Sequence, residues 1–205
     1  MSGFFDILVK GGPVMVPLVL CSVVALAISI ERFVNLKRAS TNPDKLMLKV
    51  KKTLAGGDTS NAVGFCEATP GPVARVMGTA IGLLNLPPDQ IKEGVNQAYL
   101  EEVPRLERGL TTLSTIITVA PLLGLLGTIT GLMKLFKVIA GGEIGNSEAL
   151  SSGIAEALIT TAAGLCIAIT FLVLYNLLAA QVERLTIQME KAVTELINFV
   201  RKEGR

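Results

Sequence analysis

Residues 153–169 read GIAEALITTAAGLCIAI. This stretch decides the fold, because all of it after Glu156 belongs to the longest uncharged run of the chain. No charged residue occurs over residues 157–182, a run of 26 positions. About 20 predominantly apolar residues suffice for a helix to cross a bilayer. A soluble core helix of this length would carry charges on one face. The stretch therefore predicts a membrane-spanning helix.

Two further uncharged runs lie upstream, at residues 11–30 and 109–133, and each has the length of a span. The whole chain is 50% apolar and only 18% charged, below the roughly 25% usual in soluble domains. We predict an all-α integral membrane protein with three transmembrane helices. The second and third helices are expected to extend into a helical cytoplasmic region.

The basic residues predict how the chain crosses the membrane. Sixteen of the 19 Lys and Arg residues lie within residues 32–108 or from residue 184 onward. Cytoplasmic flanks of spans are enriched in Lys and Arg. We therefore expect the N-terminus outside the cell membrane and the C-terminus in the cytoplasm. The first span is expected to stay as an anchor, since it is too long for a signal peptide and a basic run follows it.

These patterns divide the chain into seven predicted segments. They are a periplasmic N-terminal interfacial segment (1–12), transmembrane helix 1 (13–34), a cytoplasmic helical segment (35–108), transmembrane helix 2 (109–138), a periplasmic loop (139–150), transmembrane helix 3 (151–180) and a cytoplasmic amphipathic helix (181–205). A frayed terminus is an equal alternative for the first segment. Pro and Gly clusters break the segment 35–108 into several short helices.

The last segment carries apolar residues at helical spacing. They are Val182, Leu185, Met189, Ala192, Leu196 and Phe199. Such a stripe must be buried, either against the segment 35–108 or against copies of itself. With about 100 cytoplasmic residues in two stretches, an independent enzyme domain is not expected.

The second span carries small residues and a hydroxyl on one helix face. Gly124, Gly127, Thr128 and Gly131 follow the spacing i, i+3, i+4, i+7. Gly127 and Gly131 form a small-xxx-small pair, which permits close helix approach. Pro121 removes a backbone donor and is expected to bend or loosen the helix. Helix packing explains this face as well as an ion path does.

The third span has a similar face and a carboxylate. The face comprises Gly153, Ala157, Thr161, Gly164 and Ala168. Glu156 lies beside it, and a charge at mid-bilayer costs about 2.5–3.5 kcal/mol on insertion scales. Membrane carboxylates usually face a cavity or a partner, which favours a functional role. An interfacial Glu stabilised by the positive N-terminus of the helix is the alternative.

Several chemistries are excluded or disfavoured by the residues present. The chain has no His, and its three Cys residues lack metal-ligand spacing, so no metal and no cofactor are expected. No GxxxxGK[ST] loop indicates an ATP-driven transporter, and no nucleic-acid partner is expected. Thr hydroxyls can relay or coordinate an ion, but they cannot carry the charge of a transported proton near neutral pH. A proton path therefore needs Glu156 or a carboxylate on a second protein.

Two stretches together resemble the MotA/TolQ/ExbB proton-channel family, most closely its ExbB/TolQ branch. They are APLLGLLGTITGLMKLF (residues 120–136) and the stretch at residues 153–169. The resemblance implies a homopentamer around a pore lined by the second and third spans. The pore would hold single-span helices of an ExbD/TolR-like partner that carry a transmembrane Asp. It also implies that Thr128 and Thr161 match the family's pore threonines, and that Glu156 matches its third-span acid.

The resemblance implies a proton-conducting subunit of a bacterial inner membrane, with a periplasmic N-terminus. This subunit would couple the proton motive force to work at the outer membrane or envelope, with a TonB- or TolA-like protein as a further partner. Thr128, Thr161 and Glu156 would form the ion pathway. Gly124, Gly127, Gly131, Ala157 and Gly164 would pack the helices. Thr170 departs from the family, which often has Pro there. A structural membrane scaffold and a flagellar or gliding-type stator remain alternatives.

Overall fold

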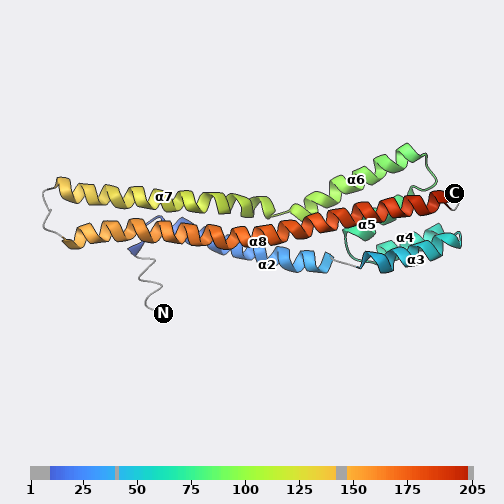
Figure 1. Ribbon diagram of the computed structural model, residues 1–205, viewed down its shortest axis with the longest axis horizontal. Helices are drawn as coiled ribbons and strands as arrows, with labels where there is room; N and C mark the ends of the chain where they lie inside the picture. The colour runs from blue at the N-terminus through green and yellow to red at the C-terminus, as the bar shows by residue number, and fades with distance from the viewer. Residues whose placement is uncertain (1–9, 40–41, 142–146, 203–205) are drawn as a thin grey trace. The chain divides into compact units, whose positions relative to one another are not determined.

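The computed structural model describes residues 10–39, 42–141 and 147–202, and in these ranges every regular element is a helix. The helices are α2 (Met15–Ala39), α3 (Pro43–Ala55), α4 (Thr59–Glu67), α5 (Pro72–Gly82), α6 (Pro88–Glu107), α7 (Leu110–Ala140) and α8 (Ser147–Lys202) (Figure 1). Most of the predicted interfacial segment 1–12 lies outside the described residues. Residues 142–146 of the predicted loop 139–150 also lie outside them.

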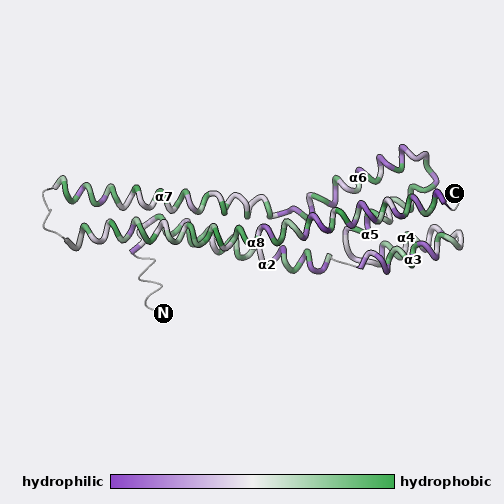
Figure 2. Tube along the Cα trace, in the orientation of Figure 1, coloured by the Kyte–Doolittle hydropathy of each residue, from purple (hydrophilic) through white to green (hydrophobic). Residues whose placement is uncertain are grey.

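Three helices are long and apolar enough to cross a membrane, which confirms the predicted fold class. These stretches begin at Met15 in α2, at Leu110 in α7 and at Leu150 in α8. Figure 2 shows apolar residues prevailing along α7 and along the first half of α8. The predicted third span and the predicted C-terminal helix are one continuous helix, since α8 runs for 56 residues.

The chain forms two compact units, which we describe separately. Unit 1 comprises residues 1–30 and 109–176, and unit 2 comprises residues 31–108 and 177–205. Unit 1 therefore holds the first part of α2, all of α7 and the first part of α8. Unit 2 holds α3 to α6 and the last part of α8.

In unit 1, the beginning of α2 packs on α7 and α8 through a small apolar cluster. Its buried members are Val14, Met15, Leu18 and Ala120, and Leu123, Ile159, Ala163 and Ile167 pack against them. The rest of α2 in this unit exposes many apolar side chains, including Leu20, Val23 and Leu26. Such faces are expected on a helix whose surroundings are lipid.

In unit 2, short helices begin and end at the predicted breakers. The side chain of Asp58 caps α4 by accepting a hydrogen bond from the amide of Asn61 at 3.0 Å. Pro104 lies inside α6, which ends at Glu107. The α4, α5 and α6 helices pack in sequence order, and α5 is buried along most of its length.

The apolar stripe at the end of α8 is buried within unit 2. Val182, Leu185, Met189, Ala192 and Leu196 are all buried. Lys51 of α3 links this part of α8 to the middle segment, because its Nζ lies 2.5 Å from Glu195 Oε1 and 5.5 Å from the ring centroid of Phe199. Of the two burial modes open from the sequence, the middle segment of the same chain accounts for the stripe.

Candidate functional site

The α7 helix and the first part of α8 run side by side in opposite directions (Figure 1). Their contacts fix the register, since Gly131 faces Ala157, Gly127 faces Thr160 and Gly124 faces Thr161. The series continues with Gly164 facing Ala120. We call this line of contacts the α7–α8 seam. It contains the three glycines that the sequence placed on one face of the second span.

The helices along the seam approach so closely that backbone meets backbone. A Cβ added at Gly131 would lie 2.6 Å from the carbonyl oxygen of Gly153. A Cβ at Gly164 would lie 2.6 Å from the carbonyl oxygen of Ala120 and 3.2 Å from Cα of Gly124. Side chains larger than hydrogen would push the two helices apart, because a backbone atom cannot rotate away. The packing role of Gly124, Gly127, Gly131, Ala157 and Gly164 stays a prediction for the assembled protein.

The two predicted pathway threonines use their hydroxyl protons differently. Thr161 Oγ1 donates to the carbonyl oxygen of Gly124 across the seam at 3.1 Å. Thr128 lies beside the seam, half-buried, and its Oγ1 donates to the carbonyl of Leu125 in its own helix at 2.6 Å. A hydroxyl also has two acceptor lone pairs. Within the described part of the chain, neither of these hydroxyl oxygens accepts a hydrogen bond.

Thr160, adjacent to Thr161, has a different environment. It is fully buried, and its side chain occupies the space that a Cβ at Gly127 would need. Its Oγ1 donates to the carbonyl of Glu156 at 2.9 Å, within its own helix. Thr160 therefore fills the seam, while the half-buried Thr161 bridges the two helices.

Glu156 is buried at one end of the seam and forms an ion pair. The Nζ of Lys134 in α7 lies 2.6 Å from Glu156 Oε2. The carboxylate side chain is 6% exposed, whereas the lysine side chain is 55% exposed. The other oxygen, Oε1, has no hydrogen-bond partner among the residues that the structure describes. A buried carboxylate in a span is a functional candidate by default, and here its cation is known.

A second buried carboxylate lies in unit 2. Glu102 of α6 accepts hydrogen bonds from Arg75 of α5 at 2.7 Å and from Arg105 at 2.7 Å.

Burial changes the pKa of two other groups of unit 2. Burial raises the pKa of the Cys66 thiol to about 11, and burial, with a smaller effect of Glu190, raises the pKa of Tyr99 to about 12. A thiol with so high a pKa is a poor nucleophile at neutral pH.

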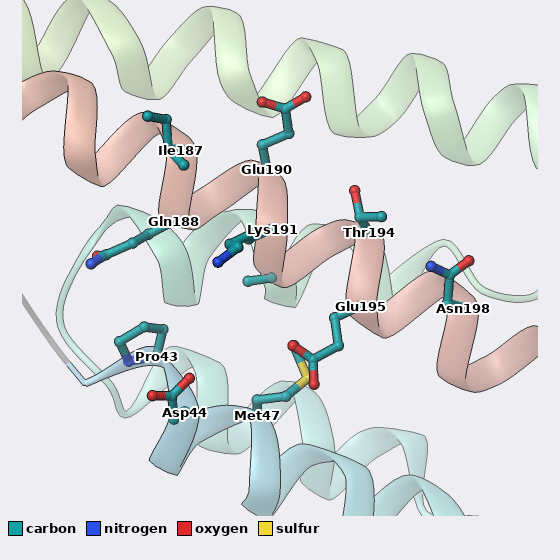
Figure 3. A pocket seen from close by; sticks show the side chains of 11 residues that line it. Pro43, Asp44, Met47, Ile187, Gln188, Glu190, Lys191, Thr194, Glu195 and Asn198 are labelled. Carbon is teal, nitrogen blue, oxygen red and sulfur yellow. The ribbon is translucent and has the colours of Figure 1, made fainter.

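A groove of about 710 Å³ lies between α3 and the last part of α8. Figure 3 shows Asp44 and Met47 of α3 on one side, with Lys191 and Glu195 of α8 on the other. None of the predicted site residues lines this groove. Among the residues that the structure describes, no group of three His, Cys, Asp or Glu is placed to hold a metal ion.

Sequence reasoning did not pair Lys134 with Glu156, although the signal was present. Once Gly131 is set opposite Ala157 in an antiparallel pair, Lys134 falls opposite Ile154, and its long side chain can reach Glu156 two residues away on α8. Lys134 and Glu156 are also the two charges nearest to the facing ends of the two uncharged runs. The packing of Thr160 against Gly127 was also missed, because the spacing alone does not tell which of two adjacent hydroxyls faces the neighbouring helix.

Comparisons with known proteins agree with these features. The model of the MotA/TolQ/ExbB proton channel family matches residues 70–191, which include α7 and most of α8. A putative biopolymer transport protein ExbB-like 1 from Synechocystis sp. is 36% identical over 85% of this chain and 70% of its own length. The biopolymer transport protein ExbB of Salmonella typhimurium is 32% identical over 86% of this chain and 75% of its own length.

The Tol-Pal system protein TolQ of Haemophilus influenzae is 27% identical over 98% of this chain and 95% of its own length. The match to TolQ of Haemophilus influenzae covers nearly the whole chain, so the similarity is not confined to one motif. Together with the three candidate spans, they support a multi-pass protein of the inner membrane. The chain belongs to the MotA/TolQ/ExbB proton channel family, in its ExbB and TolQ branch.

Proposed function

We propose that this chain is the proton-conducting subunit of an inner-membrane energy-transducing complex of the ExbB/TolQ type. It would couple the proton motive force to work at the outer membrane or envelope. The proposed assembly is a pentamer around an ExbD/TolR-like single-span partner that carries a transmembrane Asp. A TonB- or TolA-like protein would receive the motion.

The state of the Thr161 hydroxyl is the observation that carries this proposal. Its proton is committed to the carbonyl of Gly124, and its lone pairs have no donor among the described residues. The hydroxyl can therefore accept a hydrogen bond from a protonated carboxylic acid. When that acid on the partner loses its proton, the hydroxyl must turn away from Gly124 to donate to it. Thr161 thus responds to the protonation state of the partner's Asp.

Thr128 would serve as a second acceptor of the same kind. Its hydroxyl proton is bonded to Leu125 in the same helix, so its lone pairs are also available. Glu156 would stand at the outer mouth of the path, where its negative charge attracts cations. In this proposal, the chain supplies two hydroxyl groups that accept hydrogen bonds and one carboxylate. The Asp that gains and loses the proton belongs to the partner.

The test compares two adjacent threonines. We expect Thr161→Val to lower proton flux at least about tenfold in liposomes that contain this protein and its partner, since one lost hydrogen bond to an ionic group corresponds to about a tenfold factor. The matched control is Thr160→Val, which removes a fully buried hydroxyl one residue away. We expect the control to retain flux, because the Thr160 hydroxyl bonds only to its own helix.

Assembly of both variants is checked by size-exclusion chromatography before flux is compared. Wild-type flux in Thr161→Val, with normal assembly, would remove Thr161 from the ion path. That result would favour the structural scaffold, in which the hydroxyl only ties α8 to α7. Equal losses of flux in both variants would show that general packing of the seam, not the accepting hydroxyl, determines conduction.

A further inference from the structure

The Glu156 carboxylate is enclosed by three segments of unit 1. It projects from α8, and Lys134 of α7 contacts its Oε2. The third segment is the turn before α2, where Gly12 has a φ of +69°. A Cβ at Gly12 would overlap Oε1 and Cδ of Glu156. The turn thus covers the oxygen that has no hydrogen-bond partner.

The two partners of this ion pair differ in their freedom to move. Glu156 is held by burial and by the Gly12 turn, whereas more than half of the Lys134 side chain is exposed. A lysine stem has four rotatable carbons and carries a compact point charge at its end. Lys134 can therefore leave the carboxylate without any movement of α7. The Glu156 side chain, by contrast, is only 6% exposed.

Charge balance makes the position of the lysine ammonium significant. A carboxylate in an apolar span is costly unless a cation compensates it. A transported monovalent cation that visited Glu156 would need the oxygen that Lys134 now occupies. While Lys134 is in place, its positive charge also repels an incoming cation. The ammonium group and the transported ion are therefore alternative occupants of one site.

From these contacts, we infer that Lys134 is a tethered counter-ion that occupies the cation position at Glu156 and gates ion access to it. The gate opens when the lysine side chain swings into solvent and a transported cation replaces it on Oε2. This inference rests on the proposed function, because it assigns regulation to the same pathway. It adds a residue that the resemblance does not assign.

The contact itself is tested by carbodiimide coupling in the assembled complex, independently of conduction. Activated Glu156 should be attacked by the Lys134 amine, which forms an amide bond and releases the activating group as a urea. Mass spectrometry should then find the peptides of α7 and α8 cross-linked through these two residues. Lys137 in α7 is the internal control, since no ion pair to Glu156 is found for it. A cross-link from Glu156 to Lys137 in place of Lys134 would overturn the inference.

The gate is tested by ion flux in liposomes that contain this protein and its partner. Lys134→Gln keeps a hydrogen-bond donor for Glu156 but removes the charge, and Lys134→Arg keeps the charge. We expect Lys134→Gln to raise cation flux about two- to fivefold, the range of equilibrium factors for a half-exposed ion pair. Lys134→Arg should stay near wild type. Adding Glu156→Gln to Lys134→Gln should abolish the rise.

The outcomes separate this inference from the proposed function. If the wild-type complex conducts and Lys134→Gln conducts equally or less, Lys134 is not a gate, although the channel assignment stands. If the wild-type complex does not conduct protons or Na⁺, the proposed function fails whatever the cross-link shows. An equal rise in Lys134→Gln and Lys134→Arg would also overturn the gate, because the charge would not be the cause.

Discussion

In unit 1, α7 meets α8 through Gly124, Gly131 and Gly164, whereas the fully buried side chains of unit 2 include the large Met77 and Met189. Both units bury a carboxylate, but its partners differ. In the seam of unit 1, Glu156 is paired with one lysine, Lys134, whereas Glu102 in unit 2 is bonded by two arginines, Arg75 and Arg105. The α7–α8 seam thus joins two helices through glycine, whereas the core of unit 2 includes large side chains.

The difference follows from the surroundings expected for each unit. Helices in water associate because large apolar side chains leave water, at roughly 25 cal/mol per Å² of buried area. Helices in lipid gain nothing from that transfer, since lipid tails are as apolar as leucine. They gain instead from close van der Waals contact and from hydrogen bonds between helices. In unit 1, the glycines of the seam provide the close van der Waals contact, and Thr161 provides a hydrogen bond between the helices.

The largest expected effect comes from making a large side chain small in unit 2. Met189 is fully buried, so Met189→Ala should lower the free energy of unfolding by about 2–5 kcal/mol. The control is Ile187→Ala two residues away, where the side chain is 50% exposed, with an expected change within about 0.5 kcal/mol. Circular dichroism during denaturation in detergent micelles would measure both. Similar losses in both variants would contradict a packed core around Met189.

The opposite change, from small to larger, should break the seam of unit 1. Gly164→Ala places a Cβ against the backbone of Ala120, and we expect a loss of about 1–3 kcal/mol in the free energy of unfolding. Gly64→Ala in unit 2 is the matched control, because a Cβ there meets nothing within 4 Å. It should be neutral or slightly stabilising, since Ala favours a helix over Gly. A stabilised Gly164→Ala protein would refute close backbone packing.

The smallest expected effect concerns the buried carboxylate of unit 2 and the two arginines that bind it. Glu102 is 5% exposed, whereas its partners Arg75 and Arg105 are 51% and 61% exposed. Removing Glu102 leaves two arginines that water can solvate, but removing both arginines leaves a buried carboxylate. We expect Arg75→Met with Arg105→Met to cost at least about 1 kcal/mol more than Glu102→Gln in the free energy of unfolding. The reverse order would mean that water reaches Glu102.

Much of the fold could be read from single residues and their spacing. The uncharged runs at residues 109–133 and 157–182 predicted α7 and the first part of α8, because lipid tolerates no unpaired charge over that length. The Pro and Gly clusters within residues 35–108 predicted several short helices, because these residues interrupt helical hydrogen bonding. These signals are local, so they need no knowledge of neighbouring helices.

The candidate site was only partly predictable. The periodicity of Gly124, Gly127 and Gly131 indicated a face, but not what would lie against it. Thr160 and Thr161 are adjacent and chemically equal in sequence, and only their neighbours distinguish them. A helix turns by about 100° per residue, so one of two adjacent side chains can be buried while the other remains accessible.

The sequence by itself determined that this chain has three apolar helices, that it belongs to a proton-channel family and that Thr128, Thr161 and Glu156 merit attention. Only the tertiary structure decided that Lys134 pairs with Glu156, that Gly12 covers its second oxygen and that Thr161 bonds to Gly124. The physical reason is that hydropathy and helical period act along one helix. Ion pairs and hydrogen bonds between helices depend on their register, which the packing of glycine backbones sets.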